Sequence, residues 1–272
     1  SLFFGLGLWI DFFWPFVVVV STFVGCLFYR FLKEVHERQL LEKELSIART
    51  IQDNFLPRGI APLGKVSVTA FMQPAKFVAG DLYDVIALGA NRLGVLIGDV
   101  AGKGVPAALI MAQTVSCFRI LSRQHAGAAQ TLTAMNKELA PILQGRFVTA
   151  IYMIMDTQER TFGVASAGHS PMMVYRSGSR DVIEFVADGG PPIGIVEDVV
   201  YRDTPGSLSA GDKALLFTDG ITEARSGTED FGSRRLADFL KTNGQKSGRA
   251  IVARYGLKLP PVSLGLWQNF GG

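Results

Sequence analysis

Short apolar runs recur along the chain from residue 66 onward, and most have the length and the Val, Ile, Leu and Phe content of buried β-strands. We predict strands over residues 66–72, 82–88, 92–98, 147–155, 161–167, 172–175, 182–186 and 213–218. Two longer segments, 105–125 and 128–143, have helical periodicity, and a further helix is expected to begin near Ser233 and end at Leu240. This mixture predicts one α/β domain of roughly 200 residues, enough to enclose a sizeable core.

The first part of the chain has a different pattern, because residues 12–29 contain no charged side chain and are rich in Phe and Val. As a helix, this run is long enough to cross the ~30 Å hydrocarbon core of a bilayer. A buried core helix would show a polar face, and a signal peptide would have a small-residue cleavage site after the run. We therefore expect a membrane segment within residues 1–30.

Charge predicts the orientation of this segment. Only Asp11 precedes the uncharged run, whereas four basic residues follow it, namely Arg30, Lys33, Arg38 and Lys43. By the positive-inside rule, the domain that follows lies in the cytoplasm and the chain is anchored in the cell (inner) membrane.

Overall composition adds little beyond this assignment. The net charge of +3 and the pI near 8.9 owe much to the basic residues beside the membrane run and near the C-terminus, so no nucleic-acid partner is predicted. Of the two cysteines, Cys26 lies in the membrane run and Cys117 in a predicted helix. Neither indicates a disulfide framework, which agrees with a cytoplasmic domain.

Residues 31–56 form a strongly helical linker between the membrane segment and the domain, and Pro57 ends it. Five positions recur there at alternating steps of four and three, as in the a/d seam of a coiled coil: Leu41, Leu45, Ala48, Gln52 and Phe55. We call these five residues the linker seam. It predicts a helix that forms a homodimer, and a solvated helix that covers the domain is the alternative.

Three aspartates stand at the ends of apolar strand-like runs and beside glycine: Asp81, Asp99 and Asp219. Each alone could be a turn residue or a helix N-cap. Three such carboxylates without matching arginines favour hard cations, because Mg²⁺ and Mn²⁺ take oxygen ligands. The histidines, at positions 36, 125 and 169, are far apart in sequence, and His169 is expected to be a turn residue that bonds backbone. The pattern indicates a two-metal hydrolase.

Four segments, 80–84, 98–108, 167–171 and 217–224, occur in the order and spacing of a known family. Across roughly residues 44–240 the chain resembles the bacterial PPM-type (PP2C-like) serine phosphatases of the stage-II sporulation E and sigma-factor-regulator class. The resemblance implies a two-sheet β core flanked by helices, an αββα sandwich, with a Mg²⁺ or Mn²⁺ pair between the sheets. It also implies a phosphoserine or phosphothreonine protein substrate, an anti-sigma-factor antagonist in a partner-switching pathway.

The resemblance assigns roles to individual residues. Asp99 matches the ligand that bridges both metals, and Val100 matches the position that gives a backbone carbonyl to one of them. Asp81 matches a ligand of one metal, mainly through water, and Asp219 matches a ligand of the other. Asp84 is not expected to be a direct ligand. In such a site a bridging water becomes the hydroxide nucleophile near neutral pH.

The C-terminal part departs from the family, which closes with an Asp-Asp-x-Thr segment that supplies another metal carboxylate. Residues 242–272 contain no Asp or Glu, so we expect an atypical tail there, produced by a frame change or truncation. The expected divisions are therefore 1–30, 31–56, 57–241 and 242–272. One metal would lose a carboxylate and the sheet an edge strand. A catalytically impaired scaffold is thus the alternative function, and a nucleotide cyclase fits the glycine pattern less well.

Overall fold

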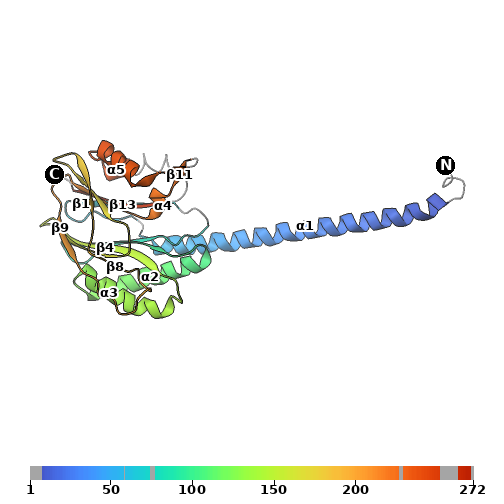
Figure 1. Cartoon of the computed structure of the whole chain (residues 1–272), viewed down its shortest axis with the longest axis horizontal. Helices are drawn as coiled ribbons and strands as arrows, with labels where there is room; N and C mark the ends of the chain where they lie inside the picture. Colours follow the sequence, from blue (N-terminus) through green and yellow to red (C-terminus); the bar gives the residue numbers. More distant parts are fainter. Residues whose placement is uncertain (1–7, 58, 74–76, 227–228, 252–262, 271–272) are drawn as a thin grey trace. The chain divides into compact units, whose positions relative to one another are not determined.

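The computed structural model describes residues 8–57, 59–73, 77–226, 229–251 and 263–270. The chain divides into two compact units, Ser1–Ile47 and Ala48–Gly272. Helix α1 (Leu8–Phe55) begins in the first unit and ends in the second (Figure 1). The second unit thus begins inside the helix, earlier in the chain than residue 57.

Within the first unit, the apolar side chains of the helix are exposed. Phe13, Trp14 and Val18 are 47%, 65% and 61% exposed, and the exposed apolar set continues to Leu32. The hydroxyls of Ser21 and Thr22 donate to the carbonyls one turn earlier, so they do not need water. Among the described residues, Phe13–Phe55 and Val105–Gln124 are the two helices long and apolar enough to cross a membrane. None of the described residues in the most apolar part of the first is buried, whereas the second packs in the core described below.

The second unit is built from two β-sheets. The first has the order β1-β13-β10-β6-β7, with all neighbours antiparallel. Its strands are β1 (Val66–Gln73), β13 (Ser263–Phe270), β10 (Lys213–Phe217), β6 (Met172–Arg176) and β7 (Asp181–Phe185). The second has the order β2-β3-β4-β5-β8, and β9 also pairs with β5. Its strands are β2 (Leu82–Ala87), β3 (Arg92–Val100), β4 (Val148–Asp156), β5 (Thr161–Ala167), β8 (Gly189–Gly190) and β9 (Thr204–Ser207).

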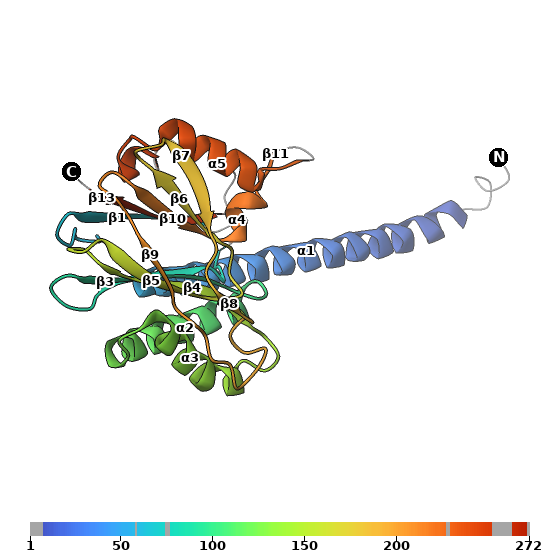
Figure 2. The same ribbon diagram turned by 60° about the vertical axis from the view of Figure 1, so that its left-hand side comes forward.

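Helices cover the outer faces of both sheets (Figure 2). The second sheet is covered by α2 (Val105–Gln124) and α3 (Ala128–Leu139), which continues into the short η1 (Ala140–Ile142). The first sheet is covered by α5 (Gly232–Asn243), with the short α4 (Asp219–Thr222) directly after β10. A small hairpin of β11 (Arg225–Ser226) and β12 (Glu229–Asp230) lies between these helices in sequence. The described elements confirm the expected two-sheet core flanked by helices.

Alternation along the strands sorts the apolar side chains into three cores. In β3, Leu96 packs toward α2 and α3, whereas Val95 and Ile97 pack between the two sheets. In β10, Leu216 lies between the sheets and Leu215 packs toward α5. Both faces of these strands are therefore buried, which is why they read in the sequence as continuous apolar runs.

The eight predicted strands and the two long predicted helices are present, with ends that differ by one or two residues, except that the segment 128–143 is divided into α3 and η1. The expectation that the sheet lacks a strand because of the atypical tail is wrong. Strand β13 pairs antiparallel with β1 along Val66↔Phe270 to Gln73↔Ser263 and with β10 on its other side. The tail thus supplies a strand between β1 and β10, away from the sheet's edges.

Candidate metal centre

The three aspartates singled out by the sequence stand at strand ends. Asp81 directly precedes β2, and Asp99 is the next-to-last residue of the neighbouring β3, where Leu82 is paired with Gly98. Asp219 lies two residues after the end of β10, a strand of the other sheet, and is the first residue of α4. The site is thus built from both sheets. We call Asp81, Asp99 and Asp219 the carboxylate cluster.

Electrostatics show that the three side chains are close to one another. Burial, followed by the negative charges of Asp99 and Asp219, raises the pKa of Asp81 from 3.8 to about 7. Burial, followed by the charge of Asp219, raises the pKa of Asp99 to about 6. A neighbouring negative charge raises the pKa of a carboxyl group in this way only at short range, so the fold gathers carboxylates from distant segments of the chain.

The surroundings of the cluster fit a cation. The Thr218 hydroxyl is buried and has no hydrogen-bond partner among the described residues, yet it lies close enough to Asp81 to favour the ionised carboxylate. Gly80 leaves room beside the cluster, because a Cβ there would lie 2.8 Å from the Val100 oxygen and 3.1 Å from Asp99 Oδ1. In the described part of the chain, no three His, Cys, Asp or Glu side chains form a ready-made ligand set. A site at the cluster would therefore take water as well, as Mg²⁺ sites usually do.

Glu223, which was not predicted as a site residue, is also close enough for its charge to act on the cluster. Its negative charge contributes to the raised pKa of Asp99. The residue is exposed and follows α4, where its N–H donates to the Asp219 oxygen over 2.7 Å. The signal for it was its position inside the segment 217–224.

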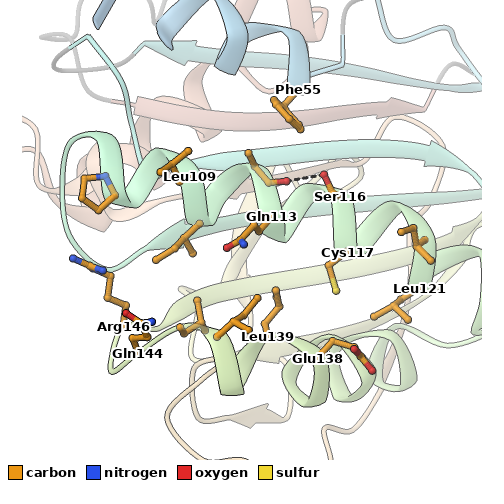
Figure 3. Close-up of a pocket in the computed structure, with 16 residues that line it drawn as sticks. Phe55, Leu109, Gln113, Ser116, Cys117, Leu121, Glu138, Leu139, Gln144 and Arg146 are labelled. Atoms are coloured by element: carbon orange, nitrogen blue, oxygen red, sulfur yellow. Dashed lines mark hydrogen bonds between the residues drawn. The ribbon is translucent and has the colours of Figure 1, made fainter. Parts of the chain in front are cut away.

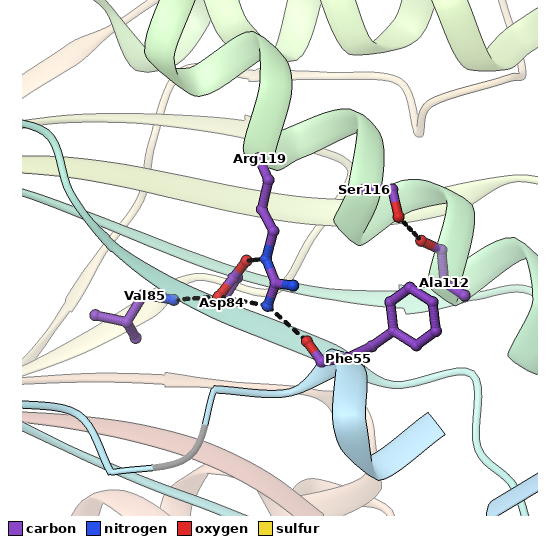
Figure 4. Close-up of polar contacts among 6 residues, drawn as sticks. All are labelled: Phe55, Asp84, Val85, Ala112, Ser116 and Arg119. Carbon is purple, nitrogen blue, oxygen red and sulfur yellow. Dashed lines mark hydrogen bonds and ion pairs between the residues drawn. The ribbon is translucent and has the colours of Figure 1, made fainter. Parts of the chain in front are cut away.

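Asp84 belongs to a separate polar contact (Figure 4). Arg119 Nε lies 2.5 Å from Asp84 Oδ2, and the Val85 N–H donates to Asp84 Oδ1 over 2.9 Å. The same guanidinium donates through Nη2 to the Phe55 carbonyl over 2.6 Å. Burial raises the pKa of Asp84, and the Arg119 charge opposes that rise. Through Arg119, Asp84 thus connects β2 to α2 and to the end of α1, and its carboxylate is occupied by this ion pair.

Gln52 makes a second contact, between the end of α1 and the segment that precedes β2. Its amide donates to the Ala79 carbonyl over 2.6 Å and accepts from the Ala79 N–H over 3.1 Å. The residue is only 5% exposed. At this end of the linker seam, Gln52 packs on its own domain, so the prediction that it faces a partner helix is wrong. The alternative of a helix that covers the domain describes this end of α1.

His169 lies beside the cluster and connects the two sheets. Its Nε2 is 3.0 Å from the Phe217 oxygen, and its Nδ1 is 3.0 Å from Thr149 Oγ1. Burial lowers the pKa of His169 to about 4, so the imidazole is neutral near pH 7. The expectation that His169 is a turn residue bonding backbone agrees with the contact to Phe217.

A groove of about 940 Å³ follows α2 and α3 (Figure 3). Apolar side chains such as Leu109, Cys117 and Leu139 line it, with Glu138 and Arg146 among its polar residues. No member of the carboxylate cluster lines this groove. It is therefore a separate feature from the candidate metal centre.

The geometry can be compared with known proteins. A family model described as Stage II sporulation protein E matches residues 89–256. Phosphoserine phosphatase RsbU of Bacillus subtilis is 29% identical over 190 residues, which are 70% of this chain and 56% of that protein. The chain spans between 36% and 56% of the length of the first three curated relatives it matches.

Solved structures share the fold. The SiaA-PP2C domain of Pseudomonas aeruginosa aligns with a TM-score of 0.71 at 23% identity, over 86% of this chain and 98% of that one. RsbX in complex with magnesium aligns with a TM-score of 0.55 at 15% identity, over 75% of this chain and 92% of that one. At these identities the likeness shows the arrangement of sheets and helices.

Gly80→Ala tests the close approach beside the cluster. The new Cβ meets the Val100 backbone and Asp99, so we expect the free energy of unfolding to fall by about 1–3 kcal/mol, the usual cost of overpacking. Urea denaturation measures the change. Gly178→Ala is the matched control, because apart from its chain neighbours no atom of the described residues lies within 4 Å of a Cβ there. If the two variants were equally stable, a Cβ at position 80 would be accommodated without cost, which would contradict the close approach to Val100 and Asp99.

Repulsion within the cluster predicts a pH dependence for protein kept metal-free with a chelator. The pKa of Asp81 is higher in the folded state, about 7, than the ordinary 3.8, so the folded state binds the proton more tightly between these values. The stabilisation of the folded state by this proton is complete below about pH 4 and is lost as the pH rises to about 7. The stability gained by Asp81→Asn should therefore grow over this range and level off above it. Denaturation at several pH values measures the gain, and a gain independent of pH contradicts the prediction.

Proposed function

The chain belongs to the stage II sporulation protein E family, and on that premise we propose that it is a membrane-anchored, metal-dependent protein serine/threonine phosphatase. The observation that carries the proposal is the carboxylate cluster, in which burial and like charge raise the pKa of Asp81 and of Asp99. A cation removes that repulsion, so the cluster is suited to hold positive charge. The name of the relative RsbU, a phosphoserine phosphatase, supports the reaction.

We assign the ligands of two divalent ions, Mg²⁺ or Mn²⁺, to Asp81, Asp99, Asp219 and the Val100 carbonyl. When bound, such a pair supplies Lewis-acid activation of water and neutralises charge on the phosphate. RsbX, which shares the fold, was solved with magnesium, which supports this choice of ion. The Thr218 hydroxyl stabilises the ionised form of Asp81, and Gly80 keeps the Val100 carbonyl and Asp99 uncovered.

The residues that follow Asp99 suit the binding of a phosphate. Gly102 and Gly104 have positive φ angles of 113° and 79°, which glycine adopts without strain, and α2 begins immediately afterwards. The free N–H groups at a helix N-terminus favour an anion. A phosphoserine or phosphothreonine side chain placed there lies beside the carboxylate cluster. The proposed substrate is a phosphorylated anti-sigma-factor antagonist in a partner-switching pathway.

Phosphate release from a phosphoserine protein, measured with the purified chain in millimolar Mn²⁺ and in chelator, tests the activity. We expect release only with metal, and we expect Asp99→Asn to lower the rate by at least ~10–100-fold. Loss of a residue that only hydrogen-bonds a metal ligand usually costs ~10–100-fold in activity. Asp99 is proposed as a ligand itself, so this range is a lower limit.

Asp238→Asn, at an exposed position on α5, is the matched control and should keep the wild-type rate. No release at millimolar Mn²⁺ contradicts the phosphatase proposal and favours a catalytically impaired scaffold. The absence of Asp and Glu from residues 242–272 is the observation behind that second outcome.

Membrane anchoring rests on the exposed apolar surface of the first unit and on the basic residues that follow it, beginning with Arg30. We expect the protein to stay in the membrane pellet after an alkaline carbonate wash. Added protease should remove the phosphatase domain from inside-out vesicles of bacterial inner membrane but not from intact spheroplasts. Release by carbonate contradicts the anchor, and digestion in spheroplasts contradicts the cytoplasmic orientation.

We also propose that the chain forms a homodimer through the N-terminal members of the linker seam, beginning with Leu41. Leu41 is 56% exposed in the first unit and is available to a second copy, whereas Gln52 is not. Light scattering of the detergent-solubilised chain distinguishes a dimer from a monomer, and a monomer under these conditions contradicts this part of the proposal.

A further inference from the structure

His169 occupies a position that the proposed phosphatase chemistry does not use. Its backbone is fixed by Ser166, whose hydroxyl exchanges bonds of 3.2 and 3.3 Å with the His169 N–H and carbonyl. Gly168 before it has a φ of 66°, and a Cβ there would lie 2.7 Å from Pro192. The turn is therefore held in one conformation, and the imidazole is directed between the two sheets.

The hydrogen bonds of the ring define its protonation. A backbone carbonyl can only accept, so Nε2 carries the proton and donates to the Phe217 oxygen. In the neutral ring Nδ1 is then an acceptor, and the Thr149 hydroxyl donates to it. We call these two bonds the His169 bridge. Both ring nitrogens are occupied by protein groups, which leaves neither of them for a substrate.

Each end of the bridge lies beside a member of the carboxylate cluster. Thr149 in β4 is the register partner of Asp99 in β3, and its Oγ1 lies 3.5 Å from the Asp99 backbone oxygen. Phe217 ends β10 and precedes Asp219 by two residues. The bridge therefore connects the backbone near Asp99 in one sheet to the backbone near Asp219 in the other.

We propose that His169 is a positioning residue that, together with Thr149, fixes the separation of Asp99 and Asp219 and so sets the affinity of the cluster for divalent ions. This inference rests on the proposed metal-dependent function. The carboxylates repel one another, and that repulsion acts to move the two strand ends apart. The bridge opposes the movement through backbone-directed bonds, so it needs no contact with the ions themselves.

Calorimetric titration of the full chain in detergent with Mn²⁺ tests the proposal without measuring catalysis. His169→Leu removes both bonds, and Thr149→Val removes one hydroxyl while keeping the side-chain shape. We expect the dissociation constant for Mn²⁺ to rise by ~10–100-fold in His169→Leu and in the same direction, by less, in Thr149→Val. His125→Ala, at the end of α2, is the control and should bind Mn²⁺ as the wild type does.

A conservative variant separates positioning from a general loss of structure. His169→Gln has both an amide donor for the Phe217 oxygen and an oxygen acceptor for the Thr149 hydroxyl, so it should restore most of the Mn²⁺ affinity lost in His169→Leu. If His169→Leu does not fold, Thr149→Val and His169→Gln decide the question. Wild-type affinity in folded His169→Leu or Thr149→Val overturns the inference alone, as does a Gln variant no better than Leu. Failure of the wild type to bind Mn²⁺ overturns the proposed function as well.

Discussion

The candidate metal centre depends on keeping three carboxyl groups together where two β-sheets meet. Asp81 and Asp99 stand at the ends of the neighbouring strands β2 and β3 in one sheet. Asp219 follows β10, the middle strand of the other sheet. Burial and mutual repulsion raise the pKa of Asp81 and of Asp99, so this arrangement costs folding free energy near neutral pH. Such a cost is typical of a functional site, because a packed core alone gives no reason to gather carboxylates.

Several contacts around the cluster use backbone atoms. Gly80 allows close approach to the Val100 carbonyl, and His169 connects the backbone of Phe217 to Thr149. Gln52 bonds both polar atoms of the Ala79 peptide, two residues before Asp81. None of these three groups carries a charge near pH 7, so they add no repulsion to the cluster, in contrast to Glu223.

The local sequence pattern was sufficient to predict most strands and helices of this fold. It was insufficient where the structure of a segment depends on distant parts of the chain. Strand β3 was predicted because it is buried on both faces and therefore reads as an apolar run. Strand β13 was missed because its sequence mixes glycine and amides with apolar residues, and its strand state depends on β1 and β10 beside it. For the site, the glycine-flanked aspartates and the family resemblance indicated the residues that the fold gathers. Gln52 fits a coiled-coil position equally well by spacing, and only its contact with Ala79 distinguishes the two interpretations.

The place of β13 has a consequence for how the domain is made on the ribosome. Strands β1 and β10 are not hydrogen-bonded to each other, since residues 263–270 lie between them. The first sheet therefore remains in two pieces, each with an open edge, until that late segment has been synthesised and inserted. Pairings between segments so far apart in sequence form slowly, because a large loop must close first. The first sheet can thus be completed only after residues 263–270 have been translated, and the nascent chain needs protection against edge-to-edge association until then.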